Sequence, residues 1–338
     1  MNQTTNSQEI NSVVKPTAAR EPILKVEELE TTFFLKSGPF RAVNRVSYSV
    51  SKGETLGVVG ESGCGKSVTS FSLMRLIEQP GQITHGRVLF QGHDLLKLPE
   101  KQVQKVRGGK MAMIFQEPMT ALNPVLTVGR QIDEQILRHE AVSPEEARER
   151  SIKMLKKVGI PSPEDRYSNY PHQLSGGMRQ RAMIAMALSC DPEVLIADEP
   201  TTALDVTIQA QILELIQSLQ EEKNMAVQFI THDLGVISEI SDRVMVMYGG
   251  MKCEEATSEA LFNSPKHPYT AALIQSRPQL GHREHRLRTI EGSVPAPHEL
   301  PAGCPFQNRC PRRIALCSKR PPEIEIQPGH RVACFNPL

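Results

Sequence analysis

Eight consecutive residues have the spacing of a phosphate-binding loop: Gly60-Glu61-Ser62-Gly63-Cys64-Gly65-Lys66-Ser67. In such a loop, glycines let backbone N–H groups surround phosphate oxygens, the lysine reaches the outer phosphates and the hydroxyl binds Mg²⁺. The mostly apolar residues 54–59 predict a buried strand before the loop, and residues 68–77 predict a helix after it. Because a strand, a loop and a helix are the setting that this motif requires, the segment predicts binding of a nucleotide with Mg²⁺.

Two acidic residues follow a second apolar run. Residues 194–197 predict a buried strand, so Asp198 lies at the strand end, where it can hold Mg²⁺ directly or through water. Glu199 comes next and can polarise an attacking water as a general base, a role commonly worth about 10²–10⁴ in rate. Two solvated acids in a turn are the alternative, which the upstream phosphate loop disfavours. The pair predicts hydrolysis of the nucleotide.

Composition excludes some classes of function. The 338 residues carry a net charge of +1 and include no tryptophan, which gives no argument for a nucleic-acid partner. No apolar run approaches the roughly 20 residues that span a bilayer. Residues 1–21 lack an apolar segment and predict a disordered tail rather than a signal peptide. A cytosolic location follows, where the seven cysteines are expected to be reduced or metal-bound.

The pattern along the chain predicts an α/β domain over residues 22–273. Expected strands lie at residues 23–29, 42–50, 87–90, 111–115, 194–197, 226–230 and 243–248. Between about 126 and 190 the apolar spacing becomes helical, which predicts an inserted helical subdomain. The later alternation of strands and helices predicts a mostly parallel sheet. Residues 274–338 are rich in Pro, His and Cys and predict a small loop-rich C-terminal extension.

A third motif makes a family resemblance visible. Leu174-Ser175-Gly176-Gly177-Met178, together with Asp198-Glu199 and His232, resembles the nucleotide-binding subunit of an ABC transporter over roughly residues 22–273. The resemblance implies a phosphate-loop ATPase with an antiparallel β subdomain and the inserted helical subdomain. It also implies that the Ser-Gly-Gly signature opens a helix facing the γ-phosphate of ATP on the opposite subunit of a head-to-tail dimer. Exposed backbone donors at a helix N-terminus suit that task.

The resemblance implies roles for further residues. Gln116 is similar to the loop glutamine that senses Mg²⁺ and His232 to the switch histidine that contacts the γ-phosphate. The run Thr202-Ala203-Leu204-Asp205 is similar to the family's D-loop. An aromatic ring that stacks on adenine is expected upstream, with Phe33 as the candidate and Phe40 second. Core packing is the alternative for either ring.

Three segments resemble the oligopeptide and dipeptide importer branch of this family. They are Phe115-Gln116-Glu117-Pro118-Met119-Thr120-Ala121-Leu122-Asn123-Pro124, Gly176-Gly177-Met178-Arg179-Gln180-Arg181 and Lys266-His267-Pro268-Tyr269-Thr270. This likeness implies a D-type subunit that pairs with a paralogous F-type ATPase, two membrane permeases and an extracytoplasmic binding protein. It also implies peripheral attachment to the cytoplasmic face of the cell (inner) membrane.

Alternative functions stay open at this level. Relatives in the same branch transport nickel chelates, glutathione or glycan fragments. A non-transport ABC ATPase is disfavoured, because only about a hundred residues separate Ser67 from Ser175 and they contain no sustained heptads of a long coiled coil. A second cassette in the chain and an Asn-Lys-x-Asp element of a GTPase are absent as well.

Four cysteines lie in the extension: Cys304-x5-Cys310-x6-Cys317-x16-Cys334. Structural zinc sites commonly place ligands two to four residues apart, so this spacing matches zinc poorly. Four thiolates can also hold an iron–sulfur cluster. Some members of the importer branch resemble this pattern and carry a [4Fe–4S] centre, so that cluster is expected here. Zinc and metal-free thiols are the alternatives.

Overall fold

The computed structural model describes residues 21–201, 205–276, 290–296 and 299–338, and the statements below concern those residues. Its early half forms a four-stranded antiparallel sheet in the order β2-β1-β4-β5. The strands are β1 (Pro22–Leu35), β2 (Gly38–Ser51), β4 (Gly81–Phe90) and β5 (His93–Asp94). Along β2, Val46, Tyr48 and Val50 alternate with less buried residues, which is the period-two pattern of a sheet with one buried face.

A second sheet forms the centre of the molecule in the order β11-β12-β10-β9-β3-β8-β7-β6. Its strands are β3 (Thr55–Val59), β6 (Met111–Ile114), β7 (Val194–Asp198), β8 (Ala226–Ile230), β9 (Arg243–Tyr248), β10 (Met251–Thr257), β11 (Glu323–Gln327) and β12 (His330–Ala333). The five strands from β9 to β6 are parallel. Every residue of β3, β6, β7 and β8 is buried, as expected of parallel strands covered on both faces.

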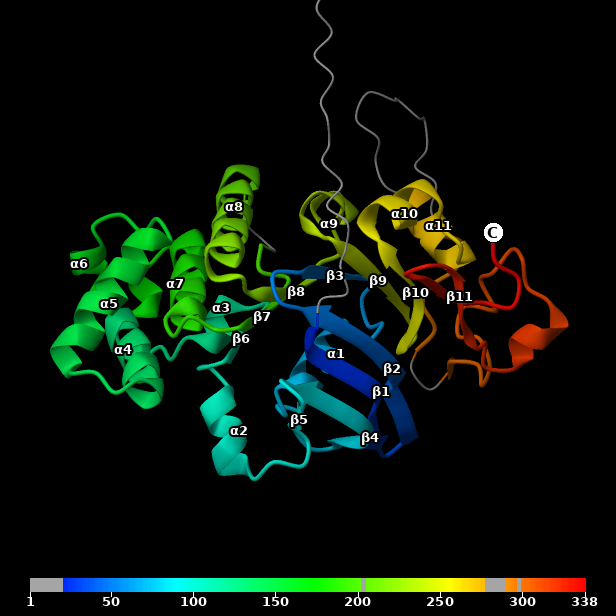
Figure 1. Cartoon of the computed structure of the whole chain (residues 1–338), viewed down its shortest axis with the longest axis horizontal. Helices are drawn as coiled ribbons and strands as arrows, with labels where there is room; N and C mark the ends of the chain where they lie inside the picture. The colour runs from blue at the N-terminus through cyan, green and yellow to red at the C-terminus, as the bar shows by residue number, and fades with distance from the viewer. Residues whose placement is uncertain (1–20, 202–204, 277–289, 297–298) are drawn as a thin grey trace, which may run out of the picture.

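Helices cover the sheet and form the inserted subdomain. They are α1 (Lys66–Leu73), α2 (Glu100–Val106), α3 (Pro118–Ala121), α4 (Val128–His139), α5 (Pro144–Lys157), α6 (Pro163–Tyr167), α7 (Gly176–Leu188), α8 (Val206–Lys223), α9 (Leu234–Ile240), α10 (Ser258–Asn263) and α11 (Pro268–Gln275). Figure 1 shows α4 to α7 gathered at one end of the molecule. In α4, Val128, Ile132 and Ile136 are four residues apart and buried, so one helix face packs inward.

The C-terminal extension is more regular than the sequence indicates. Strand β12 pairs with β10, where Glu254 lies opposite Val332, and β11 pairs with β12, so the extension lengthens the central sheet. Figure 1 shows this segment beside β10. The described part of the extension is loop-rich as expected, and its two short strands are what the sequence did not predict. All five residues of β11 are exposed, so this strand has no buried apolar face for a sequence pattern to reveal.

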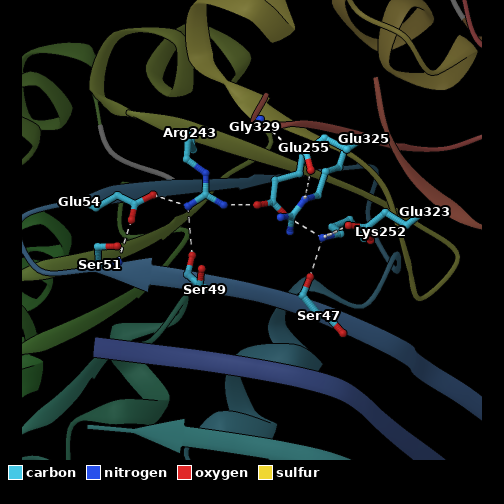
Figure 2. A network of polar contacts seen from close by, with 11 residues as sticks. Ser47, Ser49, Ser51, Glu54, Arg243, Lys252, Glu255, Glu323, Glu325 and Gly329 are labelled. Carbon is cyan, nitrogen blue, oxygen red and sulfur yellow. Dashed lines mark hydrogen bonds and ion pairs between the residues drawn. The ribbon is translucent and has the colours of Figure 1, made fainter. Parts of the chain in front are cut away.

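Buried charges connect the two sheets and the extension (Figure 2). From β9, Arg243 Nη1 donates to Glu54 Oε1 at 2.5 Å, and Nη2 donates to Glu255. On β10, Lys252 Nζ donates to Glu255 Oε2 and to the carbonyl of Ser47 in β2, both at 2.6 Å. The same ammonium lies 3.0 Å from Glu323 of β11. Burial raises the pKa of Glu255, but Lys252 and Arg243 outweigh burial and hold it below the ordinary 4.5.

We expect the substitution Glu255→Gln to lower the free energy of unfolding by about 3 kcal/mol, because it leaves the buried Lys252 and the partly buried Arg243 without a shared counter-ion. Glu325→Gln, at a carboxylate that is half exposed, is the matched control and should change little. Because the folded-state pKa of Glu255 is lowered, its contribution is complete at neutral pH and is lost as the pH falls below about 4.5. Urea unfolding of both variants at pH 7 and pH 4 measures this, and equal losses in the two would contradict it.

Candidate functional site

The phosphate loop takes a shape that needs glycine. The φ angles of Gly60, Gly63 and Gly65 are 153°, 77° and 101°. A Cβ atom on Gly60 would lie 2.2 Å from the carbonyl oxygen of Met247 in β9. A Cβ atom on Gly65 would lie 2.3 Å from that of Ala42 in β2. The loop is therefore wedged between the backbones of both sheets, and no larger residue fits at either end.

Lys66 and Ser67 begin α1 directly after this loop, so the positive end of the helix faces the loop interior. The Lys66 side chain is buried, and its ammonium donates to the carbonyl of Gly60 at 2.7 Å and to that of Glu61 at 3.2 Å. The loop thus encloses one positive charge among backbone groups. This arrangement is suited to the outer phosphates of a nucleotide.

Asp198 is the last residue of β7, and its carboxylate lies beside Ser67 at the start of α1. It is 1% exposed, accepts a hydrogen bond from Ser67, and its Oδ1 atom has no hydrogen-bond partner. Burial raises the pKa of this carboxyl, and the neighbouring Glu199 adds to the rise, whereas Ser67 and Lys66 lower it. A buried carboxylate oxygen with no hydrogen bond, beside a hydroxyl, fits a hard cation such as Mg²⁺.

Three predicted residues meet at the ends of three neighbouring strands. Gln116 follows β6, Glu199 follows β7 and His232 follows β8. Gln116 Nε2 donates to Glu199 Oε2 at 3.3 Å, and His232 Nδ1 lies 3.4 Å from the same oxygen. The backbone N–H of Glu199 donates to the carbonyl of Ile230 at 2.9 Å. Its φ angle of 47° turns the chain out of the strand direction at this residue. Such a cluster can orient a water molecule and accept its proton.

The Ser-Gly-Gly signature lies apart from this cluster. Ser175 caps α7 by accepting a hydrogen bond from Met178 N at 3.3 Å. A Cβ atom on Gly176 would meet nothing within 4 Å, so the helix N-terminus is open. Figure 1 places α7 in the helical subdomain, away from α1. The structure therefore does not bring Ser175, Gly176 and Gly177 to the phosphate loop of their own chain.

Two contacts were not predicted from the sequence. In α7, buried Gln180 donates from Nε2 to the carbonyl of Pro200, the residue after Glu199, which ties the signature helix to the carboxylate loop. In the phosphate loop, Glu61 is held by Tyr269 and Arg309 from the C-terminal part of the chain. No sequence motif joins residues so far apart, so neither contact left a signal in the sequence.

Two further predictions concern the ring that stacks on adenine and the D-loop. The rings of Phe33 and Phe40 stack on each other with centroids 5.4 Å apart across the β1–β2 pair, so both have a structural role. Stacking of Phe33 on adenine stays a prediction. Of the D-loop residues, 202–204 lie outside the described part of the chain. Asp205 caps α8 by accepting a hydrogen bond from Ile208 N at 2.9 Å.

The four C-terminal cysteines lie near one another. Burial raises the pKa of Cys304 to about 11, and Cys317, Cys334 and Cys310 add to the rise. The Cys304 N–H donates to the Cys317 carbonyl at 2.9 Å. Within the described ranges, however, no group of three or more His, Cys, Asp or Glu side chains has the geometry to hold a metal ion. The structure therefore gives no support to the expected [4Fe–4S] centre.

Comparison with known proteins identifies the family. A sequence model of the ABC transporter family matches residues 43–202, and one of the oligopeptide/dipeptide transporter C-terminal region matches residues 253–317. A dipeptide transport ATP-binding protein of Bacillus subtilis is 50% identical over 93% of this chain and 95% of its own length. The chain belongs to the ABC transporter family, as one of its ATP-binding subunits. It is therefore an ATPase of the transporter type.

Other comparisons agree with this assignment. A dipeptide transport ATP-binding protein of Haemophilus influenzae is 48% identical over 94% of this chain and 96% of its own length. An oligopeptide transport ATP-binding protein of Escherichia coli is 48% identical over 94% of both chains. The solved structure of a dimeric bacterial ABC transporter cassette is 29% identical, has a TM-score of 0.63, and covers 70% of this chain and 98% of its own. The expected ABC ATPase fold is thereby confirmed.

Beyond the phosphate loop, this ABC subunit has a pocket of about 380 Å³ between β6, α2, α4 and α7. Met74, Leu76, Met113 and Phe115 line it, and Arg138 and His139 contribute charge or polarity. Burial lowers the pKa of His139.

None of the described helices is both long and apolar enough to cross a membrane.

We expect Gly65→Ala to lower the free energy of unfolding of the nucleotide-free subunit by about 3 kcal/mol or more, because both the left-handed backbone and the Ala42 carbonyl oppose a Cβ atom. Gly63→Ala is the control. There a Cβ atom meets nothing within 4 Å, so backbone strain of about 1 kcal/mol is the whole cost. Chemical denaturation distinguishes the two. Equal losses would show that the contact with β2 is unimportant.

Proposed function

We propose that the chain is the ATP-hydrolysing subunit of an importer for dipeptides and oligopeptides. One observation carries the hydrolytic part: Gln116, Glu199 and His232 converge at the ends of adjacent strands, beside the Ser67–Asp198 pair. The substrate class rests on the curated relatives, which are named for dipeptide or oligopeptide transport. The match of residues 253–317 to a C-terminal region of the same transporters supports the same class.

We assign the hydrolytic roles as follows. The N–H groups of Gly63, Gly65, Lys66 and Ser67 and the ammonium of Lys66 bind the phosphates of ATP. Ser67, Asp198 and Gln116 supply the ligands for Mg²⁺, which neutralises charge on the outer phosphates when it is bound. Glu199 accepts the proton of the attacking water. The exposed His232, 3.4 Å from Glu199, contacts the γ-phosphate and keeps the carboxylate oriented.

A second ATPase subunit completes each site in this proposal. Ser175 and Gly176 begin an open helix N-terminus that lies away from the phosphate loop of its own chain. In this proposal the helix binds the γ-phosphate of ATP held by another chain. Two solved structures similar to this chain are described as dimeric cassettes, one of them bound to ADP and Pi. We propose a head-to-tail pair with a paralogous F-type ATPase.

The remaining partners are two membrane permeases and an extracytoplasmic binding protein, and the subunit acts at the cytoplasmic face of the cell (inner) membrane. The 380 Å³ pocket is the docking site that we assign to a permease segment. Its apolar lining residues and the guanidinium of Arg138 suit an amphipathic segment with acidic residues. Phe115, the residue before Gln116, lines this pocket, so a permease segment bound there lies beside the loop that leads to the hydrolytic cluster.

For the C-terminal cysteines we propose a structural [4Fe–4S] cluster bound by Cys304, Cys310, Cys317 and Cys334. The hydrogen bond from the Cys304 N–H to the Cys317 carbonyl shows that these two residues are neighbours, and the family resemblance supports the cluster. Metal binding would add folding energy to a segment whose apolar content is small. Zinc or reduced thiols without metal are the competing states.

We expect Glu199→Gln to keep ATP affinity but to slow hydrolysis in the assembled transporter by about 10²-fold or more. Growth of an amino-acid auxotroph that receives the required amino acid only in peptides of two to five residues should then fail. The matched control is Glu193→Gln, at a carboxylate on the opposite end of β7. Normal growth of the Glu199→Gln strain, with redundant importers removed, would contradict peptide uptake. Undiminished hydrolysis would contradict the role of Glu199.

We expect the anaerobically purified chain to contain about four iron and four acid-labile sulfide per molecule, with visible absorption that disappears in Cys310→Ser. Cys190→Ser, at a buried cysteine outside the extension, is the control and should keep the absorption. Metal analysis and absorption spectroscopy measure both. Stoichiometric zinc without iron, or protein free of metal, would exclude the cluster.

A further inference from the structure

The C-terminal extension contacts the phosphate loop at Glu61. Arg309 donates from Nη1 to Glu61 Oε2 at 2.8 Å and from Nη2 to Glu61 Oε1 at 3.2 Å, which is a bidentate ion pair. From α11, the hydroxyl of Tyr269 accepts a hydrogen bond from the Glu61 N–H at 2.9 Å. The side chain and the main chain of the second residue of the loop are thus both held by the C-terminal part of the chain.

Arg309 is itself firmly placed. Its side chain is 6% exposed, and its guanidinium lies 5.8 Å from the ring centre of Tyr248 in β9. The Nε atom donates to the Glu291 carbonyl at 3.0 Å, and Nη2 donates to the carbonyls of Ile290 and Gly292, both at 3.2 Å. Because these contacts use the planar fork of donors, a lysine could not replace them.

The contact reaches the residue that binds phosphate. Lys66 donates to the Glu61 carbonyl at 3.2 Å, and the N–H of Cys64 donates to the same oxygen at 3.2 Å. The position of Glu61 therefore influences both where the Lys66 ammonium lies and how the loop turns at Cys64. Tyr269 accepts the Glu61 N–H. In the proposed site the phosphates are bound by other N–H groups, those of Gly63, Gly65 and the start of α1.

We propose that Arg309 is a positioning residue that, together with Tyr269, clamps Glu61 and pre-organises the phosphate loop for ATP. The inference rests on the proposed role of that loop in binding ATP. A loop held in its binding conformation loses less entropy when the ligand binds. The hydrolytic residues Glu199 and His232 follow other strands, so loss of the clamp raises the KM for ATP and changes kcat little.

Substitution of Glu61 separates this role from simple electrostatics. Removal of a carboxylate near the triphosphate would by charge alone strengthen ATP binding. The clamp predicts the opposite sign for Glu61→Gln, because the amide cannot accept the bidentate pair from Arg309. A weaker affinity in this variant therefore identifies a positioning effect.

The experiment measures the Kd for MgATP of the full-length chain, and KM and kcat in the assembled transporter, for Arg309→Gln, Glu61→Gln and the double variant. Each single substitution should raise the Kd about tenfold, which corresponds to about 1.4 kcal/mol, and the double variant should be no worse than either single one. Arg312→Gln is the matched control, since Arg312 lies in the same segment but contacts Asn336 and Pro337. It should bind ATP as the parent chain does.

Two results would overturn the inference: unchanged or tighter ATP binding in Glu61→Gln, or additive losses in the double variant. Where Arg309→Gln does not fold, Glu61→Gln decides alone, because its side chain lies in a partly exposed loop. Lys66→Ala separates the two levels of the argument. If it keeps full ATP affinity, the proposed role of the loop fails and the clamp with it. If it loses ATP affinity while Glu61→Gln does not, the clamp alone fails.

Discussion

The parallel register of β3, β9, β8, β7 and β6 is the constraint on which the site depends. Parallel strands end at a common edge, so residues that follow different strands meet there although they are far apart in the sequence. The phosphate loop follows β3, Asp198 ends β7, and Gln116 and His232 follow β6 and β8. A shift of one strand by a single residue would turn its side chains to the other face and separate the cluster.

The parallel arrangement of these strands also explains which site residues could be predicted from the sequence. A motif that lies within one loop, such as residues 60–67, carries its own geometry, because its glycines are required by local backbone angles. The acidic pair of Asp198 and Glu199 was predicted from the apolar run before it, which reads as a buried strand. The roles of Gln116 and His232 came from the family resemblance, and both residues lie just after predicted strands. The parallel order of those strands then fixes their meeting. The fold class and these residues therefore followed from local patterns and from the family resemblance.

Features that depend on contacts between distant segments were not predictable in this way. All of β11 is exposed and β12 has only four residues, so neither strand is long or apolar enough to be recognised in the sequence, and both form because β10 offers an edge for pairing. The bidentate pair between Arg309 and Glu61 joins residues 248 positions apart. Phe33 shows the reverse case, since an aromatic residue in a strand signals stacking without naming the partner, and here the described partner is Phe40.

The central sheet also links its two ends mechanically. At one end, buried Gln180 fixes the signature helix α7 to the carbonyl of Pro200, next to Glu199. At the other end, Lys252 joins β10 to Ser47 of β2 and to Glu323 of the extension. The β9 strand lies between, and its Met247 carbonyl is the wall against which Gly60 packs. The helical subdomain and the extension are thus both joined by polar contacts to elements that carry or adjoin the site.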